Sequence, residues 1–154
     1  MKAALLADRG VIKVAGDGAR NFLHGLVTAD ILQLNVGEAR FCALLTPQGK
    51  IIADFIMTQA SAKDGGGFFL DVPLAEALTL VGKLNLYRLR AKVIVEDLSP
   101  VLGVLAAWDG ASPPPATAVG LCYGDPRLPA LGLRVMLPPH LAGAAAAELD
   151  ASLV

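Results

Sequence analysis

Hydrophobic and polar positions at the start of the chain predict two short strands and a helix. The apolar runs Ala3–Ala7 and Val11–Ala15 flank an Asp-Arg-Gly turn, and we expect them to form a pair of strands. Asp17 is a favourable N-cap, and apolar residues follow it at helical spacing up to about Val27. The chain is therefore expected to open β-β-α.

Three further strands and a second helix are predicted next. Ala39–Leu45 and Ile51–Gln59 are separated by a turn with Pro and Gly in typical places, and Phe68–Val72 follows a run of three glycines. These strands predict one antiparallel sheet. Pro73 suits the first position of a helix. The apolar stripe of this helix recurs at steps of three and four, at Leu74, Leu78, Val81, Leu84 and Tyr87.

The first hundred residues together indicate an α+β fold. A strand predicted at Val93–Glu96 completes the order β-β-α-β-β-β-α-β, in which helices pack on an antiparallel sheet, and Val101–Trp108 is predicted as a further strand. Asp109–Thr117 contains three consecutive prolines and is typical of a surface loop or linker. The sequence changes character at this loop.

The last third holds few elements for its length. Short strands are predicted at Leu121–Tyr123 and Leu131–Leu137, and an Ala-rich helix then runs to Leu149. We expect residues 1–98 to form a first subdomain and residues 99–154 to begin a second one.

Composition narrows the class of protein. The chain has 154 residues, 55% hydrophobic and 18% charged, which is enough to bury a core. A formal net charge of −1 gives no general attraction to nucleic acid or to membranes. No apolar run approaches the roughly 20 residues of a membrane span, and the start lacks a signal-peptide core. These features predict a soluble, cytoplasmic protein.

Residues for nucleophilic or metal chemistry are sparse. Cys42 and Cys122 have no CxxC spacing, and we expect both to be packing residues. His24 and His140 have no evident partners, and no Gly-x-Ser-x-Gly motif occurs. The Gly-Asp-Gly at 16–18 lacks the third Gly of a dinucleotide-binding motif. We therefore predict no catalytic residue and no metal ligand.

The polar residues fit better with binding of a small anionic ligand that carries a hydrogen-bonding ring. Such a ligand needs a carboxylate or amide for the ring and Arg or Lys for its acidic tail. Arg9, Lys50, Arg88 and Arg90 are candidates for the tail, and Asp54 is the candidate acid. Two alternatives stay open: strand alternation can place Asp54 on a solvent face, and the two arginines after the second helix suit a solvated surface.

Four segments, in order, resemble the folate-binding YgfZ-type family. They are DRGVIKVAGDGARNFLHGLVTADI, LLTPQGKIIADFIM, LNLYRLRAKVIVED and DPRLPALGLRV. Members of this family are described as tRNA-modifying or iron–sulfur cluster assembly factors, and they are relatives of the glycine-cleavage T-protein, an aminomethyltransferase. The resemblance covers most of the chain.

The resemblance implies a fold and a binding site. The family fold has two β-β-α-β-β-β-α subdomains that exchange their first strands around a folate-type pocket, followed by a barrel domain that we expect to be absent from this chain. The resemblance implies a tetrahydrofolate-type cofactor that contacts Arg9, Gln48, Lys50 and Asp54. Arg90 joins the predicted binding residues as a candidate for the acidic tail, from its position after the second helix.

Two departures from the family pattern shape the functional prediction. The first acid of the T-protein's acidic pair is replaced by Ala53, which removes the carboxylate expected to handle the transferring amine. The family's Lys-Gly-Cys-Tyr-type segment does not occur before Val154. We therefore expect this chain to be the N-terminal portion of a longer protein. Neither Cys42 nor Cys122 is expected to take the role of the cysteine in that segment.

The leading prediction is a folate-binding accessory protein of iron–sulfur cluster assembly or repair, and not a classical enzyme. Its expected partners are folate and iron–sulfur client or assembly proteins, without nucleic acid or membrane. One alternative is a folate-dependent aminomethyl- or methyltransferase in which Asp54 supplies the carboxylate. Another is a fragment that binds nothing by itself and self-associates through exposed apolar surface.

Overall fold

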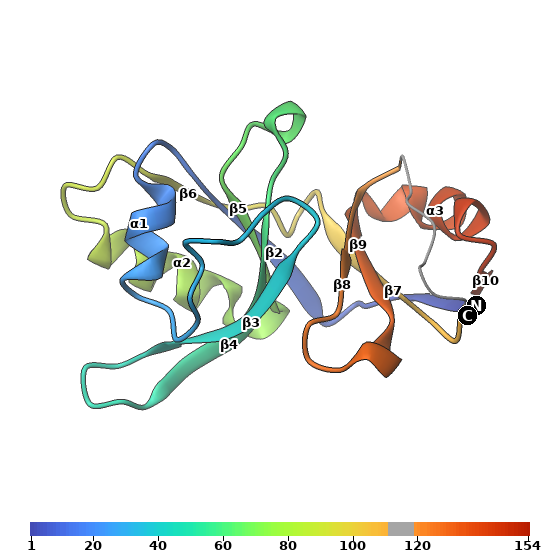
Figure 1. Ribbon diagram of the computed structural model, residues 1–154, viewed down its shortest axis with the longest axis horizontal. Coiled ribbons are helices and arrows are strands. Elements are labelled where there is room, and N and C mark those ends of the chain that lie inside the picture. The colour runs from blue at the N-terminus through green and yellow to red at the C-terminus, as the bar shows by residue number, and fades with distance from the viewer. Residues whose placement is uncertain (111–118) are drawn as a thin grey trace.

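The computed structural model describes residues 1–110 and 119–154, and it places them in two lobes (Figure 1). Most of the predicted proline-rich loop therefore lies outside the described residues. The strands are β1 (Lys2–Leu5), β2 (Arg9–Ala15), β3 (Ala39–Leu45), β4 (Ile51–Gln59), β5 (Phe68–Pro73), β6 (Ile94–Asp97), β7 (Gly103–Trp108), β8 (Leu121–Gly124), β9 (Leu133–Leu137) and β10 (Ser152–Leu153). The α-helices are α1 (Ala19–His24), α2 (Ala77–Tyr87) and α3 (Ala142–Glu148).

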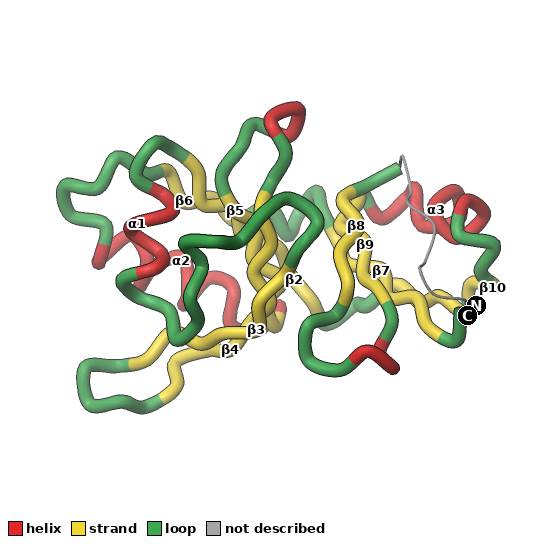
Figure 2. The backbone as a smooth tube through the Cα atoms, in the orientation of Figure 1, coloured by secondary structure: helices red, strands yellow, loops and turns green. Residues whose placement is uncertain are grey.

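Each lobe is built on one five-stranded sheet. The first lobe has the strand order β3-β4-β5-β2-β6 and carries α1 and α2, and the second has the order β10-β1-β7-β9-β8 and carries α3. Figure 2 shows α1 and α2 on the side of the first lobe away from the second lobe, and α3 to one side of the strands of the second lobe. The predicted α+β class is confirmed, because antiparallel-rich sheets with packed helices make up both lobes.

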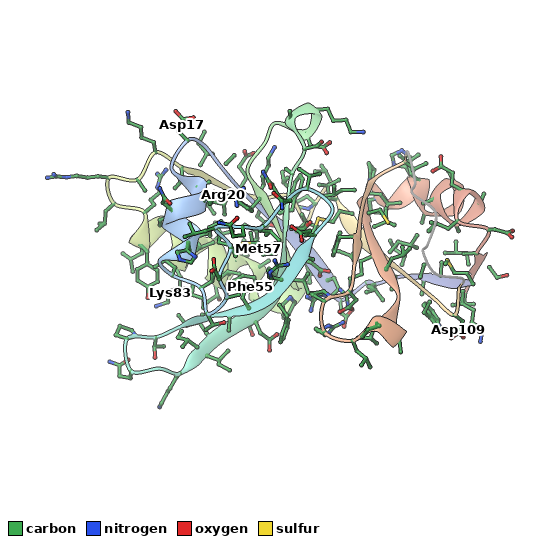
Figure 3. All side chains as sticks on the ribbon, in the orientation of Figure 1. Asp17, Arg20, Phe55, Met57, Lys83 and Asp109 are labelled. Carbon is green, nitrogen blue, oxygen red and sulfur yellow. The ribbon has the colours of Figure 1, made fainter. Side chains whose placement is uncertain are left out.

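Strand alternation divides the side chains of the first sheet between two faces. Phe55 and Met57 on β4 are fully buried and belong to the core beneath the helices, with Leu80 and Leu84 of α2 (Figure 3). Ile56 lies between them on β4 and faces the opposite way, toward the second lobe. The first sheet is therefore buried on both faces.

The predicted apolar stripe of the second helix is confirmed in its second half and wrong at its start. Leu84 is buried, and Val81 and Tyr87 pack against the core. Leu74–Glu76 forms a 3₁₀ turn and α2 begins only at Ala77. Because a 3₁₀ turn has three residues per turn, it changes the phase of the positions at the start of the helix. Leu78 is therefore 78% exposed, and Ala77 and Leu80 are buried.

The start of the first helix also differs from the prediction. Gly18 is its N-cap, with no capping hydrogen bond from a side chain, and Asp17 is exposed. The short helix is held by its contacts with the core, where Ala19 and Leu23 are buried.

The predicted pairing of the first two strands is wrong. β1 pairs antiparallel with β7 and parallel with β10, whereas β2 pairs with β5 and β6 in the other sheet. The turn between them therefore carries the chain from one lobe to the other. The fully buried Ala3 packs in the core of the second lobe, and this small side chain fits between the sheet and the Ala-rich helix α3.

An apolar layer joins the two lobes. Val11, Ile56 and Phe69 from the first sheet cluster with three buried residues of the second sheet, Val104, Tyr123 and Met136. Burying this layer ties the lobes together by the hydrophobic effect. Among the described residues, no helix has the length and apolar character needed to cross a membrane.

Candidate functional site

A charged cluster lies at one end of the apolar layer between the lobes. Its centre is Asp71 on β5, whose side chain is fully buried. Val11 of β2 and Ile56 of β4 flank Asp71 in register, and both belong to the apolar layer. Because adjacent strands in register share a face, the Asp71 carboxylate points at the second lobe.

Hydrogen-bond donors from both lobes bind the Asp71 carboxylate. Arg9 donates from Nε to Oδ1 at 2.7 Å and from Nη2 to the backbone carbonyl of Asp71 at 2.7 Å. From the second lobe, Arg134 Nη1 donates to Oδ2 at 2.6 Å and the Tyr123 hydroxyl donates to the same oxygen at 2.8 Å. A buried carboxylate is tolerated only with such partners, so Asp71 links the lobes.

A second acid extends the cluster toward solvent. Asp125 accepts hydrogen bonds from Arg127 Nε at 2.9 Å and Nη2 at 2.7 Å, and from Arg134 Nε at 3.2 Å. Arg134 therefore bridges the two aspartates. We call Arg9, Asp71, Tyr123, Asp125, Arg127 and Arg134 the interlobe charge cluster.

The cluster shifts the pKa values of its members. Burial and the neighbouring Asp71 charge raise the pKa of Tyr123 well above its usual value, so the phenol stays a donor. For Asp125, burial acts to raise the pKa, but the hydrogen bonds and charge of Arg127 and the charge of Arg134 outweigh it. The pKa of Asp125 is therefore lowered, and the carboxylate is ionised at neutral pH.

Asp54 lies beside this cluster. It is exposed, and it sits two residues before Ile56 on β4, on the face that carries Asp71's neighbours. The hydrogen bond to Asp125, then the charges of Asp125, Asp71 and Asp54, raise the pKa of Arg127. Asp54 is thus within electrostatic reach of Arg127. The sequence alternative of an exposed face is confirmed, but that face looks toward the second lobe.

The interlobe charge cluster has guanidinium N–H groups that donate no hydrogen bond to the described residues. Three arginines face two aspartates, and the Arg127 side chain is 35% exposed. Within residues 1–110 and 119–154, neither Nη1 of Arg9 nor Nη1 of Arg127 donates a hydrogen bond. Held in place by buried carboxylates, these guanidinium groups can bind an anion, and Asp54 can accept hydrogen bonds beside them.

The other predicted site residues lie elsewhere. Gln48 and Lys50 are exposed in the β3–β4 turn, and Arg90 is exposed in the loop between α2 and β6. Both segments lie at the end of the first lobe away from the second lobe (Figure 1). The structure therefore brings Arg9 and Asp54 to the lobe-facing surface but does not bring the other three there. Their role in ligand binding stays a prediction.

Sequence reasoning missed most of the cluster. Asp71, Tyr123, Asp125, Arg127 and Arg134 were not predicted as site residues. A signal existed for Asp71, because an acid within the apolar run FFLDV must find partners if the strand is buried. Asp125 pairs with Arg127 and Arg134 in its own lobe, and only Arg134 reaches Asp71 in the other lobe, so the position of this group beside the first lobe depends on how the two sheets pack.

Ala53 is 4% exposed and belongs to the core beneath the helices. It faces away from Asp54 because successive strand residues alternate. An acid at position 53 of this backbone would be buried among apolar side chains.

Two hollows adjoin the interlobe region. One of about 430 Å³ is lined by Phe69 and Met136 of the apolar layer and by Ser61, Lys63 and Cys122. A smaller one, of about 150 Å³, is lined in part by Arg9. Burial raises the pKa of the Cys122 thiol, and raises that of Cys42 to about 12, so neither is poised as a nucleophile. Among the described residues, no group of three His, Cys, Asp or Glu could hold a metal ion.

Comparison with known proteins gives close relatives for most of the chain. It is 36% identical over 148 residues to the mitochondrial iron–sulfur cluster assembly factor IBA57 homologue of Pyricularia oryzae, covering 94% of this chain and 38% of the relative. It is 33% identical over 145 residues to the Mycosarcoma maydis homologue, covering 88% of this chain and 36% of that one. The chain thus spans little more than a third of these relatives. No family model matches the chain.

The relatives' names correct the predicted location. The proteins from Pyricularia oryzae, Mycosarcoma maydis and Coccidioides immitis are all named as mitochondrial factors. The prediction of a cytoplasmic protein is therefore wrong. It rested on the lack of an apolar signal core, and this feature does not report on mitochondrial targeting, whose signals are amphipathic.

A solved structure shares the fold. The glycine cleavage system aminomethyltransferase T of Bartonella henselae superposes with a TM-score of 0.76 at 19% identity, covering 99% of this chain and 47% of that one. The predicted resemblance is thus confirmed by sequence and by fold. Over most of its length, this chain is similar to little more than a third of the IBA57 iron–sulfur cluster assembly factors, and it has a YgfZ-like fold related to that of aminomethyltransferase T.

Proposed function

We propose that this chain is the folate-binding portion of an accessory factor in iron–sulfur cluster assembly. The observation that carries the assembly role is homology over 94% of the chain to a factor of that name. The proposal gives the chain assembly or client proteins as partners and a tetrahydrofolate as ligand. The shared fold with aminomethyltransferase T is consistent with a folate site, although fold alone does not carry function.

The interlobe charge cluster supports the folate part of the proposal. A folate presents a ring that both donates and accepts hydrogen bonds and a tail with carboxylates. Asp54 can accept hydrogen bonds from the ring, and the spare donors of Arg9 and Arg127 can bind the tail. Asp71 and Asp125 hold these arginines in place, so little side-chain freedom is lost when the ligand binds.

The chemistry of position 53 supports binding without group transfer. A general base must lie within hydrogen-bond reach of the proton that it takes. Ala53 has no proton-accepting side chain and is buried away from Asp54. The proposal is therefore an accessory role, in which the folate is held but not used as an aminomethyl acceptor.

Titration of tetrahydrofolate, followed by its fluorescence, tests the site. The wild-type chain should bind saturably, and Asp54→Asn should weaken binding by about tenfold, because it removes a charged acceptor at an exposed position where folding is unaffected. Lys2→Ala, at an exposed site of the second lobe, should change the affinity by less than about twofold. The absence of saturable binding, or equal losses in the two variants, contradicts the proposed site.

Aminomethyl transfer stays a second candidate because Asp54 offers an exposed carboxylate on the lobe-facing surface. Formation of methylene-tetrahydrofolate, abolished by Asp54→Asn, would favour this enzyme activity. Folate binding without product favours the accessory role.

A further inference from the structure

The segment from α2 into β6 concentrates positive charge at one end of the first lobe. Lys83, Arg88, Arg90 and Lys92 fall within ten residues that include no Asp or Glu, although the chain as a whole carries a net charge of −1. We call residues 83–92 the basic loop. It lies at the end of the first lobe away from the second lobe, and Lys83 is labelled there (Figure 1, Figure 3).

Apolar side chains accompany these charges at the surface. Leu89 is 88% exposed between Arg88 and Arg90, and Leu86 and Ile94 nearby are 64% and 61% exposed. A single exposed apolar residue is ordinary, but two leucines and an isoleucine beside four cations form a combination found where proteins bind each other: apolar anchors within a polar rim.

The backbone of the basic loop has an unusual conformation at Leu89. Leu89 follows the C-cap of α2 and has φ +39°, in the left-handed region that normally takes Gly or Asn at this position. A side chain with a Cβ is strained there. The solvent-facing Leu89 side chain makes no core contact that would offset this strain. Packing of the folded chain therefore does not explain why a leucine stands at this position.

Some of the basic groups are fixed and others are free to bind. Arg88 Nη1 donates to the backbone carbonyl of Val93 at 3.1 Å, which braces the loop. The head groups of Arg90 and Lys92 make no hydrogen bond or ion pair with the described part of the chain. Asp17 is an acidic residue near the basic loop, because the N–H of the next residue, Gly18, donates to the Lys92 carbonyl at 3.4 Å. With one such acid beside four cations, the basic loop keeps an excess of positive charge.

We infer that the basic loop is a docking surface for an acidic segment of a partner protein, with Leu89 as its apolar anchor and Arg90 and Lys92 as its charge contacts. Charge complementarity selects the acidic partner. Single-stranded RNA fits less well, because its binding relies on exposed aromatic platforms and Tyr87 is half-buried. A membrane surface fits less well because the three exposed apolar residues do not make the broad face of an interfacial helix. The surface is separate from the interlobe charge cluster, so the inference does not depend on folate binding.

The test uses a fluorescein-labelled peptide of repeated Glu-Glu-Leu units, with fluorescence anisotropy at low ionic strength. The intact chain should bind it saturably and should bind a Glu-Glu-Ser counterpart more weakly. Arg90→Glu should weaken binding by about tenfold, since attraction becomes repulsion, and Leu89→Ser by about fivefold. Lys2→Glu makes the same charge change at a 59%-exposed site of the second lobe and should alter binding by less than about twofold.

Several results would overturn the inference. They are the absence of saturable binding, equal losses in Arg90→Glu and Lys2→Glu, or no effect of Leu89→Ser, which would reduce the interaction to general charge attraction. Tighter binding to polyuridine RNA, or to vesicles containing phosphatidylserine, would assign the loop to nucleic acid or to a membrane instead. Matching thermal unfolding curves ensure that each variant is folded.

Discussion

At the scale of single residues, Asp71 matters most because it serves both structure and site. Its carboxylate is fully buried and accepts from Arg9 in its own lobe and from Arg134 and Tyr123 in the other. Removing one partner of such a buried network leaves the remaining charges uncompensated. The geometry of the arginines at the proposed folate site therefore depends on an acid that itself does not contact solvent.

Replacing Asp71 should cost much of the stability of the chain. We expect Asp71→Asn to lower the free energy of unfolding by about 3 to 5 kcal/mol, because Arg9 and Arg134 lose their shared counter-charge. Chemical denaturation measures this change. Asp109→Asn is the matched control, since Asp109 is 65% exposed and forms only a surface ion pair with Lys2, so a loss within about 1 kcal/mol is expected. Equal effects of the two changes would mean that the cluster does not join the lobes.

Asp125 should make stability depend on acid pH. Its pKa is lowered in the folded chain by Arg127 and Arg134, so it contributes stability above the usual carboxyl pKa of about 4, and this contribution is lost as pH falls through the folded-state pKa. The difference in unfolding free energy between wild type and Asp125→Asn should therefore be largest at neutral pH and shrink below about pH 4. A difference that grows on acidification contradicts the assignment.

At the scale of elements, local pattern predicted some features and long-range packing decided others. The bounds of β3 and β4 were predicted from alternation and turn residues, and they match the structure. The buried face at the start of α2 was not, because the 3₁₀ turn before it leaves Leu78 at the surface. The pairing of β1 was not predicted by local pattern either, since an apolar run such as Ala3–Ala7 fits either sheet. The exchange of first strands that the family resemblance implied does agree with the place of β1 in the second lobe. Arg9 was identified from its turn, but its partners come from β5.

Arg20 binds several backbone carbonyls of the loop between α1 and β3. Arg20 Nη1 donates to the carbonyls of Ile31 at 2.7 Å and Leu34 at 2.9 Å, and its guanidinium stacks 5.0 Å from the centre of the Phe68 ring (Figure 3). Arg20→Met should lower the unfolding free energy by about 2 to 3 kcal/mol, through the lost charged hydrogen bonds and cation–π contact. It should also speed amide exchange across residues 31–38.

Arg90→Met is the matched control for this change, because Arg90 is exposed and makes no hydrogen bond to the described residues. Its unfolding free energy should stay within about 0.5 kcal/mol of wild type. Unchanged amide exchange in the Arg20 variant would show that other contacts order the loop.

At the scale of the whole molecule, the fold places two distinct surfaces on one chain. The interlobe surface carries Arg9, Asp54 and the buried acids, and the basic loop lies at the far end of the first lobe. The relatives are nearly three times as long as the segment that they share with this chain, so most of each relative lies outside that segment. Self-association through exposed apolar surface stays a prediction.

The residues of the proposed site could be predicted only in part, for a physical reason. A sequence reveals an arginine at a turn, as for Arg9, or an acid within an apolar strand, as for Asp54, but the lobe that such a residue faces depends on how two sheets pack. Gln48, Lys50 and Arg90 also follow turns or helix ends, yet their elements point away from the second lobe. A polar residue in such a position is thus not a sufficient signal for a site.

Amide chemical-shift mapping during a tetrahydrofolate titration shows whether folate binds at the interlobe surface. We expect saturable shifts at Arg9, Asp54 and Arg127, with little change at residues 83–92. Shifts confined to the β3–β4 turn or to the basic loop, or no shifts at a large excess of ligand, would contradict this expectation.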